Sequence, residues 1–188
     1  MLPTKSFLLA HEPHWIAARQ GVHQNLPDSA QSWIYEPGSI TQRLRSYYGD
    51  GVKVEILFLE WQAPFLSESR MLKAPAHRYA LTREVLLHCN GKPLILARTI
   101  IPERTLRAAR RNLAHLGNRP LGEVIFSYPK LQRMEMDFTE AEPSVWTESS
   151  RETAHIDQSV WGRRTIYSIR DRQMLINEFF MPDALLLP

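Results

Sequence analysis

The sequence predicts an α+β domain in which a single antiparallel sheet is flanked by helices. Two pairs of apolar runs, within residues 79–101 and 163–181, meet at short turns and are typical of antiparallel hairpins. Helical periodicity is confined to separate segments near residues 28–48 and 105–116. No linker or internal repeat interrupts the 188 residues, a length that suits one domain.

The central element is the hairpin of residues 79–101, whose turn is Asn90-Gly91. Asn-Gly between two apolar runs favours a two-residue turn, because both turn residues must adopt a positive φ. Strict pairing then places Val85 opposite Leu96, and Arg83 opposite Arg98. A slip of one residue, or a bulge, would flip the phase of the strand and remove the basis for this pairing.

Two facing arginines repel each other and keep their charge when buried. We therefore expect an anion on the face that carries Arg83 and Arg98. The anion is either a carboxylate of the protein or a ligand with one or more carboxylates, which match an arginine in paired hydrogen bonds. The alternative is an exposed face on which water solvates both arginines.

The remaining elements follow in chain order. Residues 1–26 form an arm without clear periodicity, and a helix begins at Asp28 or Ser29 and stops at Pro37-Gly38. Ser39 caps a second helix, which Gly49 ends. Residues 52–61 are apolar on both phases, which indicates a strand covered on both faces, and residues 62–76 read as a long loop or lid.

The second half alternates similarly. Residues 105–116 predict a helix with a buried stripe, residues 130–138 predict a strand, and the polar residues 139–159 suggest an inserted excursion or loop. In the last strand, Glu178 shares its phase with Ile176 and Phe180. A carboxylate on an apolar face is costly unless it is paired or protonated. It is therefore either a partner of Arg83 or Arg98, or a functional group.

Composition narrows the class of protein. A net charge of +3 permits an anionic ligand but does not predict nucleic-acid binding, and a single cysteine suits a reducing compartment. No apolar run is long enough for a signal peptide or a membrane span, so we expect a cytoplasmic protein. The arginines near residues 104–111 are expected on a solvated helix face, and His11 and His14 lack a third metal ligand. No metal or cofactor is expected.

Several segments together resemble the chorismate pyruvate-lyase family, whose bacterial members make 4-hydroxybenzoate for ubiquinone. They occur in family order and cover most of the chain from about residue 26: Arg83-Glu-Val-Leu-Leu, Asn90-Gly-Lys-Pro93, Ala97-Arg-Thr-Ile-Ile-Pro102, Pro120-Leu-Gly122, Trp161-Gly-Arg-Arg164 and Asn177-Glu-Phe-Phe-Met-Pro182. Two departures are a longer arm before residue 26 and a longer 139–159 segment.

The resemblance implies a ligand site beneath flap-like segments of an antiparallel domain. It assigns a substrate carboxylate to Arg83, the other end of the ligand to Glu178 and part of the wall to Leu121. Ile40 stands where the family has a methionine. The implied activity converts chorismate to 4-hydroxybenzoate and pyruvate in a monomer without a metal or cofactor.

On this basis we expect Arg83 to bind the ring carboxylate and Arg98 the enolpyruvyl carboxylate. Glu178 is expected to act as a general acid, in a protonated form, or as a hydrogen-bond partner. A non-catalytic module of the same fold that binds aromatic acids, as in bacterial regulators, is the alternative. Residues 1–50 show no convincing recognition helix, which favours the enzyme.

Overall fold

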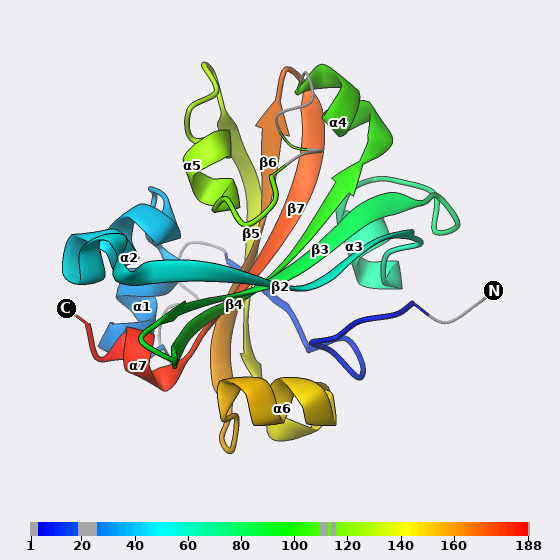
Figure 1. The fold of residues 1–188 in the computed structure, drawn as a ribbon. Coiled ribbons are helices and arrows are strands. Elements are labelled where there is room, and N and C mark those ends of the chain that lie inside the picture. The colour runs from blue at the N-terminus through cyan, green and yellow to red at the C-terminus, as the bar shows by residue number, and fades with distance from the viewer. Residues whose placement is uncertain (1–3, 19–25, 110–112, 114–115, 188) are drawn as a thin grey trace.

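A computed structural model describes residues 4–18, 26–109, 113 and 116–187 of the chain. Within these residues, seven strands form one antiparallel sheet in the order β1-β5-β6-β7-β4-β3-β2 (Figure 1). The strands are β1 (Ile16–Ala17), β2 (Val52–Gln62), β3 (Ala80–Cys89), β4 (Lys92–Pro102), β5 (Gln132–Ala141), β6 (Val160–Ile169) and β7 (Arg172–Phe180). The predicted fold class is confirmed.

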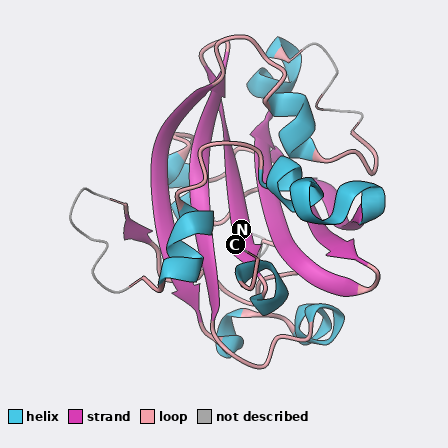
Figure 2. Cartoon of the chain, turned by 90° about the vertical axis from the view of Figure 1, so that its left-hand side faces the viewer, coloured by secondary structure: helices cyan, strands magenta, loops and turns pink. Residues whose placement is uncertain are grey.

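Short helices flank this sheet, as Figure 2 shows. They are α1 (Asp28–Ile34), α2 (Ile40–Tyr48), α3 (Leu66–Met71), α4 (Glu103–Ala108), α5 (Leu121–Ile125), α6 (Glu148–Ala154) and α7 (Pro182–Leu185), with 3-10 turns η2 (Gly49–Gly51) and η3 (Pro143–Val145). The expected caps of α2 are present: the Ser39 hydroxyl accepts the Gln42 N–H at 3.3 Å, and Gly49 ends the helix with φ 54°.

The two faces of the sheet pack against different parts of the chain. Along β7, Ile176 and Phe180 belong to the apolar clusters that include α1, α2 and α5. Leu175 and Phe179 point the other way, toward clusters that include α3, α6 and the N-terminal Leu8. We call the first the inner face and the second the outer face of the sheet.

The central hairpin has the expected turn. Asn90 and Gly91 adopt φ values of 50° and 78°, as a two-residue turn requires, and Cys89 pairs with Lys92. One step further, however, the register shifts, because Leu94 is an extra residue on β4 between the partners of Leu87 and His88. The bulge follows Pro93, which has no N–H to donate to the ladder.

This bulge overturns the predicted pairing of the arginines. Arg83 lies opposite Thr99, while Arg98 lies opposite Glu84. Arg83 and Arg98 therefore project from opposite faces of the sheet, Arg83 inward and Arg98 outward. The repulsion that led us to expect a shared anion does not exist.

Three other segments differ from expectation because their environment is set by distant parts of the chain. Strand β2 is the end strand of the sheet, so Leu59 and Trp61 are each 48% exposed rather than covered on both faces. The segment 62–76 contains α3. Residues 139–159 are not an irregular excursion, since they complete β5, form η3 and α6, and bury Trp146 on the outer face.

The arm before α1 is also part of the fold. Leu8 and Leu9 are buried on the outer face, and β1 pairs with β5. The helix expected over 105–116 is described as α4 to Ala108. Its stripe of Leu106, Ala109, Leu113 and Leu116 is buried, while Arg110 and Arg111 lie outside the described residues.

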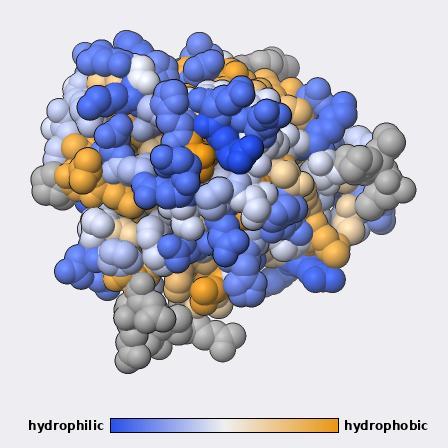
Figure 3. Space-filling model, turned by 90° about the horizontal axis from the view of Figure 1, so that it is seen from below, coloured by the Kyte–Doolittle hydropathy of each residue, from blue (hydrophilic) through white to orange (hydrophobic). Residues whose placement is uncertain are grey.

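The lower surface in Figure 3 is mostly hydrophilic, with apolar side chains in small groups. Such mixing is ordinary for a folded domain. No helix in the described ranges has both the length and the apolar character needed to cross a bilayer.

Candidate active site

A pocket lies on the inner face, between the sheet and the helices α2 and α5. Strands β3, β4, β6 and β7 contribute to its floor, and the space between atoms, counted with its opening to solvent, is about 540 Å³. The lining is mainly apolar, as in most ligand sites. The polar side chains among the lining residues are Thr41, Arg83, Thr99, Tyr167 and Glu178.

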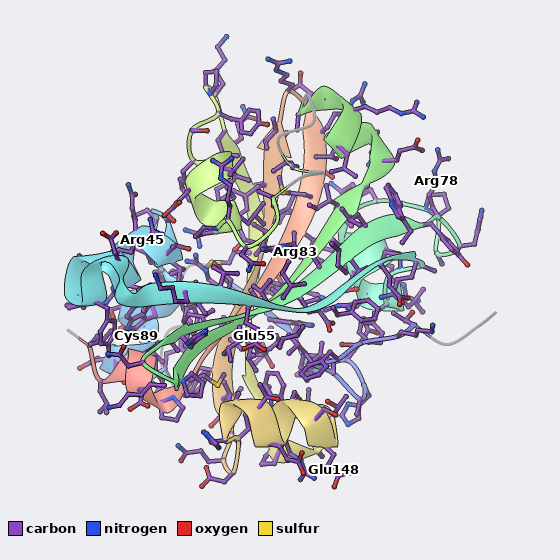
Figure 4. The ribbon with its side chains drawn as sticks, in the orientation of Figure 1. Arg45, Glu55, Arg78, Arg83, Cys89 and Glu148 are labelled. Carbon is purple, nitrogen blue, oxygen red and sulfur yellow. The ribbon has the colours of Figure 1, made fainter. Side chains whose placement is uncertain are left out.

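Arg83 brings a positive charge into this pocket (Figure 4). Its side chain comes from the middle of β3, and the residue is only 3% exposed. One terminal nitrogen donates to the carbonyls of Gly117 at 3.0 Å and Arg119 at 3.3 Å, while the buried Nε has no hydrogen-bond partner among the described residues. Burial lowers the pKa of Arg83 to about 10, so the guanidinium remains charged at neutral pH.

No carboxylate of the described residues lies within ion-pair distance of Arg83. The residues outside the described ranges include no aspartate or glutamate, so none of their side chains supplies one. A buried charge without a counterion is costly. The Arg83 end of the pocket therefore carries a positive charge with no counterion among the described residues.

Glu178 brings a negative charge into the same pocket from β7. Its Oε2 accepts a hydrogen bond from Nε of Arg163, on the neighbouring strand β6, at 2.7 Å. The sequence offered Arg83 or Arg98 as partners, and both are replaced by Arg163. One oxygen of the carboxylate is thus bonded to Arg163, and the residue also lines the pocket, so Glu178 can form a hydrogen bond with a ligand there.

Tyr167 adds a third polar group to the pocket. It is 2% exposed and lies two residues beyond Thr165 on the inner face of β6. Burial, together with the nearby charge of Glu178, raises the pKa of Tyr167, so its phenol stays protonated at neutral pH. A protonated phenol beside a carboxylate is a hydrogen-bond donor available to a ligand.

Ile40 and Leu121 both line the pocket, each near the start of its helix. The two helices approach closely: a Cβ added to Gly122 would lie 2.6 Å from the Ser39 hydroxyl oxygen. Arg45 and Glu123 form an ion pair between the same helices. The close approach of α2 and α5 fixes the positions of Ile40 and Leu121.

Arg98 is not brought to this pocket. On the outer face, its Nε and one terminal nitrogen donate to Glu68 at 2.8 and 3.0 Å, and its other terminal nitrogen donates to Glu84 at 2.6 Å. Although burial alone would lower it, the carboxylates of Glu68 and Glu84 raise the pKa of Arg98. The arginine that we expected to bind the enolpyruvyl carboxylate is thus already paired inside the protein.

The described residues contain no group of three or more His, Cys, Asp or Glu side chains that could hold a metal ion. Sequence reasoning missed Arg163, Thr99 and Tyr167 as neighbours of the site. For Arg163 a signal exists, because the phase of β6 places it with Thr165 and Tyr167 on a largely apolar strand. Glu68 was missed because its segment was expected to be a loop.

Comparison with known proteins identifies relatives over nearly the whole chain. The family model described as "Chorismate lyase" matches residues 11–186. A "Probable chorismate pyruvate-lyase" from Methylococcus capsulatus is 40% identical over 158 residues, which cover 84% of this chain and 98% of the relative. A protein of the same description from Hydrogenovibrio crunogenus is 32% identical over 184 residues, covering 97% and 98%.

Solved structures give the same fold at much lower identity. The PhnF C-terminal domain has a TM-score of 0.57 and 12% identity, over 78% of this chain and 89% of that domain. A GntR-family transcriptional regulator from Bacillus cereus has a TM-score of 0.56 and 11% identity, over 71% and 94%. These regulators show the fold alone. The family follows from the model match and the sequence relatives: this chain belongs to the chorismate lyase family.

Proposed function

We propose that this protein is a lyase that converts chorismate to 4-hydroxybenzoate and pyruvate, the first committed step toward ubiquinone. The observation that carries the proposal is one apolar pocket lined both by Arg83, a guanidinium with no carboxylate partner among the described residues, and by the carboxyl group of Glu178. Chorismate offers a ring carboxylate to the first group and a hydroxyl at ring carbon C4 to the second. Family membership and the descriptions of the relatives support the same reaction.

The chemistry needs positioning more than it needs a reactive group. The ether bond from C3 to the enolpyruvyl oxygen breaks, the hydrogen on C4 is lost and the ring becomes aromatic. The enolpyruvyl methylene gains a hydrogen, and the group leaves as pyruvate. Aromatisation supplies the driving force, so the protein has to hold the ring in the geometry for elimination and exclude competing exits. Arg83 anchors the ring carboxylate, Glu178 accepts the hydrogen bond of the C4 hydroxyl, and the apolar contacts of Ile40 and Leu121 hold the ring.

Arg98 binds no substrate carboxylate, because its nitrogens already donate to Glu68 and Glu84. The enolpyruvyl group therefore lies in the part of the pocket whose polar side chains are Thr41, Thr99 or Tyr167. All three can donate a hydroxyl hydrogen to a carboxylate.

The test is to incubate purified protein with chorismate and to identify the products by mass and by the absorbance of 4-hydroxybenzoate. We expect stoichiometric 4-hydroxybenzoate and pyruvate. Replacing Arg83 by Gln should lower kcat/KM by about 10- to 100-fold, because a hydrogen bond to a charged group contributes roughly 1.5–3 kcal/mol. E178Q should also reduce turnover. The exposed pair supplies matched controls, R107Q and E103Q.

Turnover no faster than the spontaneous decay of chorismate, together with tight binding of aromatic acids, would instead favour a sensing module. A different product mass would indicate a lyase for another chorismate-like compound. Deuterium placed at C4 shows where the C4 hydrogen goes during the elimination. If it appears in the methyl group of pyruvate in ordinary water, it has been transferred directly to the enolpyruvyl methylene.

A further inference from the structure

Arg163 stands directly behind Glu178 and does not line the pocket. The residue is 1% exposed, so no bulk water competes for its donors. While Nε donates to Glu178, one terminal nitrogen donates to the carbonyls of Ile34 at 3.1 Å and Glu36 at 2.7 Å. These carbonyls lie at the C-terminal end of α1, where orphan acceptors and the helix dipole favour a cation.

The guanidinium is a rigid planar fork, so its bonds to α1 fix the direction in which Nε points. That direction in turn fixes Glu178, because one of its two carboxylate oxygens is committed to Nε at 2.7 Å. Arg133 lies close to this group, because it donates to the same Glu36 carbonyl at 3.1 Å. Burial and the charge of Arg163 lower the pKa of Arg133, a sign that the two guanidinium groups share one confined region.

We propose that Arg163 is a positioning residue, which takes its own orientation from the end of α1 and holds the Glu178 carboxylate in the direction of the pocket. The inference rests on the proposed function in one respect, that the ligand hydroxyl meets Glu178. It assigns to α1, which contributes no side chain to the pocket, a role in setting the geometry at the reacting end.

The chain contains a matched control in the next residue. Arg164 is on the same strand but on the outer face, 8% exposed, and its Nε donates to Asp137 at 2.7 Å. Asp137 does not line the pocket. Breaking the Arg164 pair therefore reports what the loss of a buried ion pair costs the fold, without touching Glu178.

The experiment compares R163Q, R163K and R164Q with the wild type by calorimetric binding of 4-hydroxybenzoate and of benzoate, which lacks the hydroxyl. We expect R163Q to weaken 4-hydroxybenzoate about tenfold and benzoate less than about twofold, because misplacing one contact removes only that contact. R163K should recover part of the loss, since it keeps the charge but not the fork. R164Q should change neither affinity.

A double-mutant cycle tests whether Arg163 acts through Glu178. In the E178Q background, R163Q should have less than about a twofold effect on 4-hydroxybenzoate, because the group it positions has been altered. If R163Q is not folded at the assay temperature, R163K takes its place in the cycle. Equal losses in both backgrounds, equal losses for benzoate, or equal losses in R164Q would overturn the proposal.

Turnover of chorismate provides a second readout and separates the two proposals. In R163Q we expect kcat/KM for chorismate to fall about tenfold, because the bound substrate loses the contact of its C4 hydroxyl with Glu178. A wild-type protein that binds 4-hydroxybenzoate with the expected variant pattern, yet does not turn over chorismate, would remove the proposed function and leave the role of Arg163 standing. Failure of the wild type to bind either aromatic acid would remove both.

Discussion

Arg83 and Arg98 lie on adjacent strands, but their electrostatic partners differ. Arg98 is enclosed by two carboxylates, whereas Arg83 faces the pocket and, within the described part of the chain, donates only to backbone carbonyls. A buried ion pair stabilises mainly in the sense that removing one member is costly. A buried guanidinium without a counterion opposes folding until a ligand arrives. Stability and binding therefore respond differently to the loss of each arginine.

For R83M, we expect the free energy of unfolding at pH 7 to be equal to or above that of the wild type. The pKa of Arg83, about 10 when folded, lies below its usual value, so the unfolded chain binds this proton more tightly. The cost of burying the charge is thus fully present below pH 10 and disappears as the pH rises from there toward the pKa of the unfolded chain. Urea unfolding, with R107M as the exposed control, checks the sign.

The same R83M variant should lose about 100-fold in affinity for 4-hydroxybenzoate, measured by calorimetry. A loss of stability greater than about 2 kcal/mol with unchanged affinity would mean that Arg83 is a structural residue, held by the Gly117 and Arg119 carbonyls.

For R98M, the expectation is reversed. Removing this guanidinium leaves Glu68 and Glu84 buried without their partner, which should lower the free energy of unfolding by about 3–5 kcal/mol. The folded fraction should bind 4-hydroxybenzoate within about twofold of the wild type, because Arg98 lies on the outer face. Urea unfolding and calorimetry at low temperature measure the two effects. A 100-fold loss of affinity in folded R98M would restore Arg98 to the ligand.

At the scale of elements, the contact between α2 and α5 leaves no room for a side chain at position 122 unless the Ser39 hydroxyl moves. Gly122 sits against the Ser39 hydroxyl, which also caps α2, and the neighbouring Ile40 and Leu121 line the pocket. A methyl group at position 122 must displace the cap or separate the helices. Pocket shape is therefore coupled to helix capping at this contact.

We expect G122A to destabilise the protein by about 1–3 kcal/mol through overpacking, and to weaken aromatic-acid binding. S39G alone should cost only a few tenths of a kcal/mol, because glycine is tolerated at an N-cap. The double variant should be more stable than the sum of the two changes, since S39G removes the atom that the new methyl group meets. Thermal and urea unfolding of the four proteins measure the coupling, and strict additivity would contradict it.

Features determined locally were predictable from the sequence. The positive φ of Asn90 and Gly91, the Ser39 cap and the Gly49 stop follow from the residues themselves. The register beyond the turn was not predictable, because the extra Leu94 is accommodated by packing and by its carbonyl, which accepts the Met181 N–H at 2.9 Å. The exposure of β2 depends on strand order, which local patterns do not contain.

The candidate site shows the same division. Alternation within each strand, with the family resemblance, placed Arg83, Glu178, Leu121 and Ile40 at one pocket, and the structure brings these four together. The hairpin that places β6 beside β7 was predicted, but the residue opposite Glu178 depends on where its turn falls, and in the structure that residue is Arg163.

At the scale of the whole molecule, the N-terminal segment ties the outer face together. The Glu84 carboxylate accepts hydrogen bonds from the Ser6 hydroxyl and the Phe7 N–H, and Leu8 is fully buried beside them. These contacts span more than seventy residues of sequence. The segment is therefore a structural part of the domain.

Removing the residues before Ala10 should lower the free energy of unfolding by about 3 kcal/mol or more, because burial of Leu8 and Leu9 contributes roughly 1.5–3 kcal/mol each. The pocket lies on the other face, so the truncated protein should still bind 4-hydroxybenzoate at low temperature. Thermal unfolding and calorimetry check both statements. An unchanged melting temperature would show that the segment contributes nothing to stability.

The extra residue at Leu94 has a consequence for the whole sheet. It determines from which face of the sheet every later side chain of β4 projects. As a result, Thr99 lines the pocket, while Arg98 pairs with Glu68 and Glu84 on the outer face. If Leu94 were absent and the strand regular, Thr99 and Arg98 would exchange faces. Arg98 would then lie close to Arg83, and Glu68 and Glu84 would lose their cationic partner. The extra residue Leu94 thus keeps the charge of Arg98 neutralised by carboxylates on the outer face. On the inner face it leaves the positive charge of Arg83 facing the pocket, where an acid can bind.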